Sequence, residues 1–154
     1  MTVHANTNFT ATAEAALPAY THSPVSLAFG AMSRALSDHI EAERDLQHSG
    51  SWDLACTDWL RDAEVVRQTL IAALAELAAL PLQRVEDNPL RNMGFVIGAL
   101  VVSGNALEAL QLEALAVEHE PLLRCHGDHP LAHRVNLWLQ TAEQQLITLR
   151  TLPD

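Results

Sequence analysis

The chain has 154 residues, of which 49% are hydrophobic and 18% are charged. A chain of this length and composition folds as one domain with a core of its own, and it is too apolar for wholesale disorder. Its formal net charge is −10, and all nine of its basic residues are arginines. This acidity excludes the electrostatic footprint of a nucleic-acid-binding protein and argues against an anionic membrane surface as partner.

The cysteines and the hydropathy pattern indicate the compartment. Cys56 and Cys125 are too few for a disulfide framework, which favours a reducing environment. Residues 1–19 have neither the basic start nor the continuous apolar stretch of a secretory signal. The most apolar run, residues 93–102, is about half as long as a segment that spans a bilayer. We therefore predict a cytoplasmic protein, and the use of Arg without Lys is typical of a GC-rich bacterial genome.

The first segment is predicted to be a flexible tail followed by a helix. Residues 1–22 show no sustained period and are expected to be mobile, so residues 23–154 form the predicted domain. Ser23-Pro24 is typical of a helix start, with a capping serine followed by Pro at the first helical position. This helix is predicted to run to about Gln47, with Gly50 just beyond its end.

The second predicted helix organises the chain. Its apolar positions alternate in steps of four and three without an interrupting Pro or Gly, which defines the buried face of a long amphipathic helix. The positions are Trp52, Cys56, Trp59, Ala63, Val66, Leu70, Ala73, Leu77 and Leu80. Such a face needs partner helices of similar length, and Pro81 ends the helix.

The third predicted helix begins at Asn88-Pro89 and extends to about Glu118. It is apolar around its whole circumference between residues 93 and 102, which indicates burial on all sides. Its glycines suggest tight packing or a local kink. We expect Gly94, Gly98 and Ser103 to form an interface between two chains in a symmetric dimer, unless the tail or a tilt of the helices covers this face.

The fourth predicted helix begins near Asp128 to Pro130 and continues to about Leu149. No segment alternates as a β-strand does, and the links between the helices are short. The sequence therefore predicts an all-α fold, an up-down-up-down antiparallel four-helix bundle.

In that topology one end of the bundle would collect most of the histidines, both cysteines and several carboxylates. Within this group, His39 with Glu43 and His129 with His133 are each spaced i, i+4, so each pair could share one ligand. If the pairs faced each other they could hold zinc or iron. A solvated polar end and a pH-responsive cluster are the alternatives.

The sequence contains no motif that names a reaction, because a glycine-rich phosphate loop, His-Glu-x-x-His and Cys-x-x-Cys-His are all missing. We predict a non-enzymatic helical bundle that acts through self-association or partner binding, most simply as a homodimer, with another protein as the alternative partner. The alternative function is binding of a metal or small ligand at the His- and carboxylate-rich end. A small enzyme with a pocket at that end is a third hypothesis.

Overall fold

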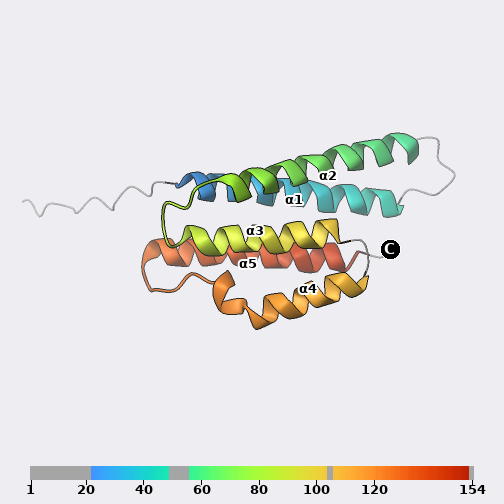
Figure 1. Ribbon diagram of the computed structural model, residues 1–154. Helices are drawn as coiled ribbons and strands as arrows, with labels where there is room; N and C mark the ends of the chain where they lie inside the picture. Colours follow the sequence, from blue (N-terminus) through green and yellow to red (C-terminus); the bar gives the residue numbers. More distant parts are fainter. Residues whose placement is uncertain (1–21, 49–55, 104–105, 153–154) are drawn as a thin grey trace, which may run out of the picture.

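The computed structural model describes residues 22–48, 56–103 and 106–152, and all secondary structure in these ranges is helical. The predicted all-α class is therefore confirmed, whereas the predicted tail, residues 1–22, lies almost wholly outside the described residues. The elements are α1 (Pro24–His48), α2 (Cys56–Ala79), α3 (Asp87–Val102), α4 (Ala106–Glu118), the 3-10 helix η1 (Glu120–Leu123) and α5 (Pro130–Arg150) (Figure 1). No helix among them is long and apolar enough to cross a bilayer.

The start of α1 is capped as predicted and is tied to the start of α3. The Ser23 hydroxyl accepts a hydrogen bond from the Ser26 backbone N–H (3.0 Å) and donates one to the Asp87 carboxylate (2.5 Å). Asp87 also accepts hydrogen bonds from the backbone N–H groups of Gln83 and Arg84. This buried carboxylate therefore joins α1, the α2–α3 link and α3 at one end of the molecule.

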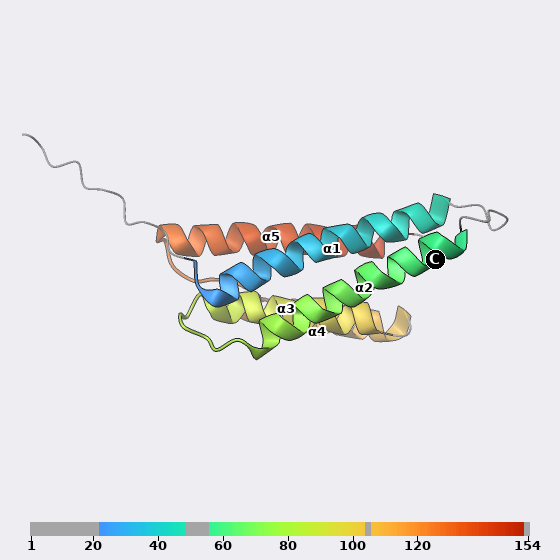
Figure 2. The ribbon, with the colours of Figure 1, turned by 90° about the horizontal axis from the view of Figure 1, so that it is seen from above.

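The α1–α2 hairpin confirms part of the predicted apolar face of the second helix. Ala63, Leu70 and Leu77 are buried, but Trp59 is 40% exposed, and Trp52 and the side chain of Cys56 lie outside the described residues. Trp59 is exposed because the last turns of α1 and the first turns of α2 project beyond the ends of α3 and α5 (Figures 1 and 2).

The prediction of one continuous third helix is wrong, because this segment forms two helices, α3 and α4. Residue Val102 ends α3, the Ser103 hydroxyl donates to the Leu100 carbonyl (2.7 Å), and Ala106 begins α4, which runs back in the opposite direction. The sequence of the break, Ser103-Gly104-Asn105, has the composition of a turn, and each of these residue types lowers helix propensity.

Because of this break, every later helix runs in the direction opposite to the one predicted. Figure 1 shows α1, α3 and α5 running in one direction and α2 and α4 in the other. The antiparallel four-helix bundle is therefore not confirmed: the described residues form five α-helices, and α5 is parallel to α1 and α3.

The helices form three layers, with the α1–α2 hairpin on one side of α3 and α5 and α4 on the other. The largest fully buried apolar side chains come from α1, α2, α3 and α5. They are Val25, Phe29, Met32, Leu36, Leu70, Leu77, Leu90, Met93, Ile97, Val135 and Leu139. In contrast, none of the described side chains of α4, residues 107–118, is buried.

Candidate functional site

The two residue pairs of the predicted metal site lie at opposite ends of the molecule. His129 Nε2 is 3.4 Å from the Glu86 carboxylate, next to the Asp87–Ser23 contact at the start of α1. His39 is 15 residues further along α1 than Pro24, which corresponds to about 22 Å of helix. Because α5 runs parallel to α1, its start lies beside the start of α1 and not beside its end. The four side chains therefore do not converge.

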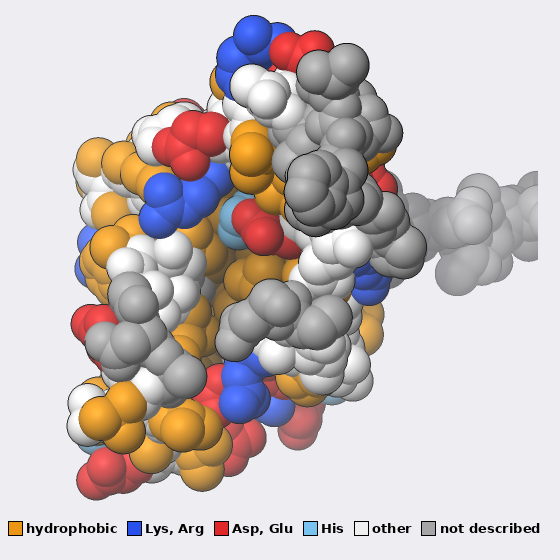
Figure 3. All heavy atoms as spheres, turned by 90° about the vertical axis from the view of Figure 1, so that its right-hand side faces the viewer, with side chains coloured by type: hydrophobic (Ala, Val, Ile, Leu, Met, Phe, Trp, Pro, Cys, Tyr) orange, Lys and Arg blue, Asp and Glu red, His pale blue; other side chains and the backbone are white. Residues whose placement is uncertain are grey.

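His39 is buried in the second half of α1, with its Nδ1 atom 3.8 Å from Glu43 Oε1 and without a hydrogen-bond partner. Burial lowers the pKa of His39, Glu43 acts in the opposite direction, and the Arg67 guanidinium lowers the pKa further. Arg67 itself donates to the Val101 carbonyl of α3 (3.4 Å). Figure 3 views this end of the molecule, where the surface is hollowed between the helices, with hydrophobic side chains along the hollow.

In the second pair, His129 has a structural role. His129 is the N-cap of α5, because its Nδ1 accepts a hydrogen bond from the Ala132 backbone N–H (3.2 Å). A lone pair used in this way is not available to a metal ion. His133, one turn later, is exposed.

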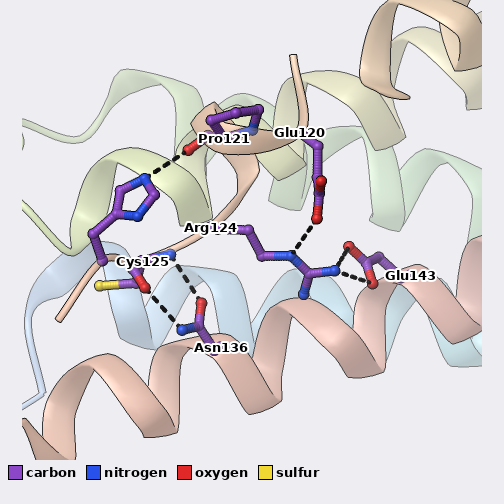
Figure 4. A network of polar contacts seen from close by, with 7 residues as sticks. Glu120, Pro121, Arg124, Cys125, Asn136 and Glu143 are labelled. Carbon is purple, nitrogen blue, oxygen red and sulfur yellow. Dashed lines mark hydrogen bonds and ion pairs between the residues drawn. The ribbon is translucent and has the colours of Figure 1, made fainter. Parts of the chain in front are cut away.

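Other groups at this end add no metal-binding cluster. Among the described residues, no group of three His, Cys, Asp or Glu side chains could hold an ion. Burial raises the pKa of the Cys125 thiol, and the nearby Glu86 raises it further, which favours the thiol over the nucleophilic thiolate. The Cys125 backbone N–H and carbonyl are each 2.8 Å from the Asn136 side-chain amide, which fastens the loop before α5 to that helix (Figure 4).

The small residues that we expected at a dimer interface instead pack within the chain or end a helix. A Cβ atom on Gly94 would lie 2.6 Å from Leu77 Cδ2, and one on Gly98 would lie 3.8 Å from Leu74 Cδ1. Gly94 thus allows α3 to approach α2 closely, whereas Gly98 faces α2 with room for a methyl group. Ser103 makes its side-chain hydrogen bond at the end of α3.

The exposed apolar residues indicate a different surface. Of the fourteen large hydrophobic side chains that are exposed in the described part of the chain, seven lie between residues 95 and 122. We call them the α3–α4 surface: Phe95, Val102, Leu107, Leu110, Leu115, Val117 and Leu122.

Helix α4 contributes most of this surface because it is apolar on two sides. Its inner side, Ala109, Leu112 and Ala116, is half-buried against the rest of the molecule. Its outer side carries Leu107, Leu110, Ala114 and Val117, all of them exposed. These four positions are spaced three, four and three residues apart, which is the spacing of a helix that packs against another helix. Both stripes can be found in the sequence as apolar residues on two sides of the helix.

Two hollows flank α4. A groove of about 290 Å³ lies between α3 and α4 and is lined by Phe95, Leu115 and Leu122 among others. A cavity of about 300 Å³ lies between α3, α4 and α5, with Glu113, Glu120, Glu143 and Arg150 among its lining residues.

Comparison with models of protein families, with curated proteins and with solved structures finds no significant match. The side chains of the chain itself therefore carry the functional argument.

Proposed function

We propose that this protein acts by association, as a non-enzymatic helical protein, and that a second copy of the chain packs against the outer stripe of α4. The observation that carries the proposal is this stripe, Leu107, Leu110, Ala114 and Val117, which is exposed and spaced for helix–helix packing.

The marginal stability of α4 supports a partner. An isolated helix shorter than about 12–15 residues is only marginally stable in water, and most helical stability in proteins comes from tertiary packing. Helix α4 has 13 residues, and none of its described side chains is buried. Packing of its outer stripe would supply the burial that the chain alone does not provide.

A second copy fits the stripe because the stripe is complementary to itself. In a two-fold dimer the two α4 helices run antiparallel. A residue on one side of the centre of the stripe then faces the residue that lies equally far on the other side of the centre in the partner subunit. Leu107 then lies opposite Val117 of the partner subunit, and Leu110 lies opposite Ala114 of the partner subunit. The large leucine side chain thus meets the small alanine at both central positions, as interdigitating helices require.

The expected dimer is weak. Burial of Leu107, Leu110 and Val117 from each chain contributes about 1.5–3 kcal/mol for each side chain. Association costs about 4–15 kcal/mol, a range that overlaps the gain from these six side chains, so only a small surplus is left for binding.

Light scattering and sedimentation velocity over a range of concentrations test the proposal. We expect a concentration-dependent dimer for the natural sequence and a monomer for Leu107→Glu, because the substitution places a charge in the apolar contact. Leu137→Glu on α5 is the matched control, since Leu137 is 62% exposed and Leu107 is 67% exposed. A monomer at all concentrations, or equal loss of the dimer in both variants, contradicts the proposal.

A further inference from the structure

The cavity between α3, α4 and α5 is a second feature that the dimer does not explain. Its volume is about 300 Å³, and its walls are mainly apolar, with Met93 and Leu100 from α3, Ala116 from α4, and Leu146 and Ile147 from α5. A volume of this size lies at the lower end of the range for small-molecule sites, so a ligand has to be small.

One side of the cavity carries excess negative charge. Glu120 and Glu143 both line the cavity, and both are paired with the same guanidinium, that of Arg124. Arg124 Nε is 3.3 Å from Glu120 Oε1, and its Nη2 atom is 3.2 Å from Glu143 Oε1 (Figure 4). Two carboxylates and one guanidinium have a formal charge of −1.

The other ionic pair of the cavity is neutral. Arg150 of α5 is paired with Glu113 of α4, and both residues line the cavity. Arg150 follows Glu143 by seven residues, which is about 10 Å along the helix. The cavity thus has an apolar interior, a negative group at one position and a neutral ion pair about two helical turns away.

We propose that this cavity binds a small amphiphile that carries a primary ammonium group. The aliphatic chain packs against Met93, Leu146 and their apolar neighbours, and the ammonium group donates hydrogen bonds to Glu120 and Glu143. An ammonium has three donors and no acceptor, and it neutralises the charge that Arg124 leaves unbalanced. An anionic amphiphile of the same length meets repulsion at this position. Val117 both lines the cavity and belongs to the outer stripe of α4. The charge recognition is separate from the dimer, because neither carboxylate belongs to that stripe.

Isothermal titration calorimetry with three ligands of one chain length tests the site. The probes are octylammonium and octanoate, both below their micellar concentrations, and octan-1-ol, below its solubility limit. We expect octylammonium to bind at least about tenfold more tightly than octanoate, with octanol between them, and we expect salt to weaken the preference. No binding of octylammonium, or equal or tighter binding of octanoate, overturns the proposal.

Variants of the lining residues locate the binding. Glu143→Gln is expected to weaken octylammonium binding by about fivefold and to leave octanol binding unchanged, since it removes charge and keeps shape. Glu76→Gln on α2, at an exposed position away from the cavity, is the matched control. Leu146→Trp is expected to abolish binding of all three ligands by filling the cavity, and its circular dichroism spectrum and melting temperature show whether it folds.

If Leu146→Trp is unfolded, the charge variant decides the question. Unchanged octylammonium affinity in Glu143→Gln overturns the assignment, and so does an equal loss in Glu76→Gln. Light scattering of the same variants reports the dimer separately, so failure of the cavity proposal is distinguishable from failure of the proposed association.

Discussion

At the scale of single residues, the buried histidine is the most informative position. His39 occupies a place on α1 where an apolar side chain would pack well, and its Nδ1 atom has no hydrogen-bond partner. A buried polar group of this kind reduces stability. Glu43 lies 3.8 Å away but is itself partly exposed, so it offsets little of the cost of burying a charge.

The lowered pKa of His39 predicts acid destabilisation of the fold. In the unfolded chain His39 titrates near its ordinary value of about 6.5, whereas in the folded protein it takes up its proton at lower pH. Above that range the residue is neutral in both states and contributes no pH dependence. As the pH falls below about 6.5, the unfolded state binds more protons, so the free energy of unfolding decreases by up to about 1.4 kcal/mol per pH unit.

Urea titrations between pH 7.5 and pH 5 measure this effect. We expect His39→Gln to have a flatter pH dependence than the natural sequence, whatever its stability at neutral pH. His133→Gln is the control, because it removes a histidine at an exposed position. Equal slopes in the natural chain and in His39→Gln would refute the role of His39.

At the scale of elements, two glycines with different surroundings lie at the contact between α2 and α3. A Cβ atom on Gly94 would approach Leu77 Cδ2 to 2.6 Å, and Leu77 is fully buried. A Cβ atom on Gly98 would make an ordinary contact, 3.8 Å from Leu74. The same substitution therefore has opposite expected effects at the two positions.

We predict that Gly94→Ala destabilises the protein and that Gly98→Ala stabilises it. Overpacking against Leu77 costs about 1–3 kcal/mol, which exceeds the gain of up to about 1 kcal/mol from higher helix propensity. At Gly98 only the propensity gain remains, so the expected stabilisation is about 0.5–1 kcal/mol. Chemical denaturation of both variants checks the prediction, and a change of the same sign at both positions would contradict it.

The elements also show what could be predicted from the sequence. The start of α1 follows from Ser23-Pro24, and the end of α2 follows from Leu80-Pro81, because capping and proline chemistry act locally. The break at Ser103-Gly104-Asn105 was missed, since apolar residues on both sides of it extend the helical pattern. A helix and a helical hairpin share that pattern, and only the turn composition distinguishes them.

At the scale of the whole molecule, the missed break explains why the predicted metal site did not assemble. Because the chain reverses once more than predicted, α5 starts beside the beginning of α1 and not beside the end of α1. His129 and His133 therefore lie far from His39 and Glu43. The i, i+4 spacings depend only on local helix geometry. Their convergence depends on the number of helices between them, which is a property of the whole chain.

The net charge of the whole molecule predicts how the proposed dimer responds to salt. Each chain carries a formal charge of −10, and α4 contains three glutamates and no basic residue. Two such chains repel each other while their apolar stripes attract. Between about 0.01 M and 0.1 M salt the screening length falls from about 30 Å to about 10 Å, so the repulsion weakens and the dimer should become tighter.

Sedimentation equilibrium at these two salt concentrations measures the effect. We expect the dissociation constant to fall severalfold as salt is added, and we expect a smaller change for Glu118→Gln, which removes one negative charge next to Val117 in each chain. Glu76→Gln removes the same charge on α2, away from the stripe, and should retain more of the salt response. A dimer that weakens as salt is added would mean that opposite charges meet across the interface. Because α4 supplies no positive charge, that result would exclude pairing of two α4 helices and place the contact elsewhere on the molecule.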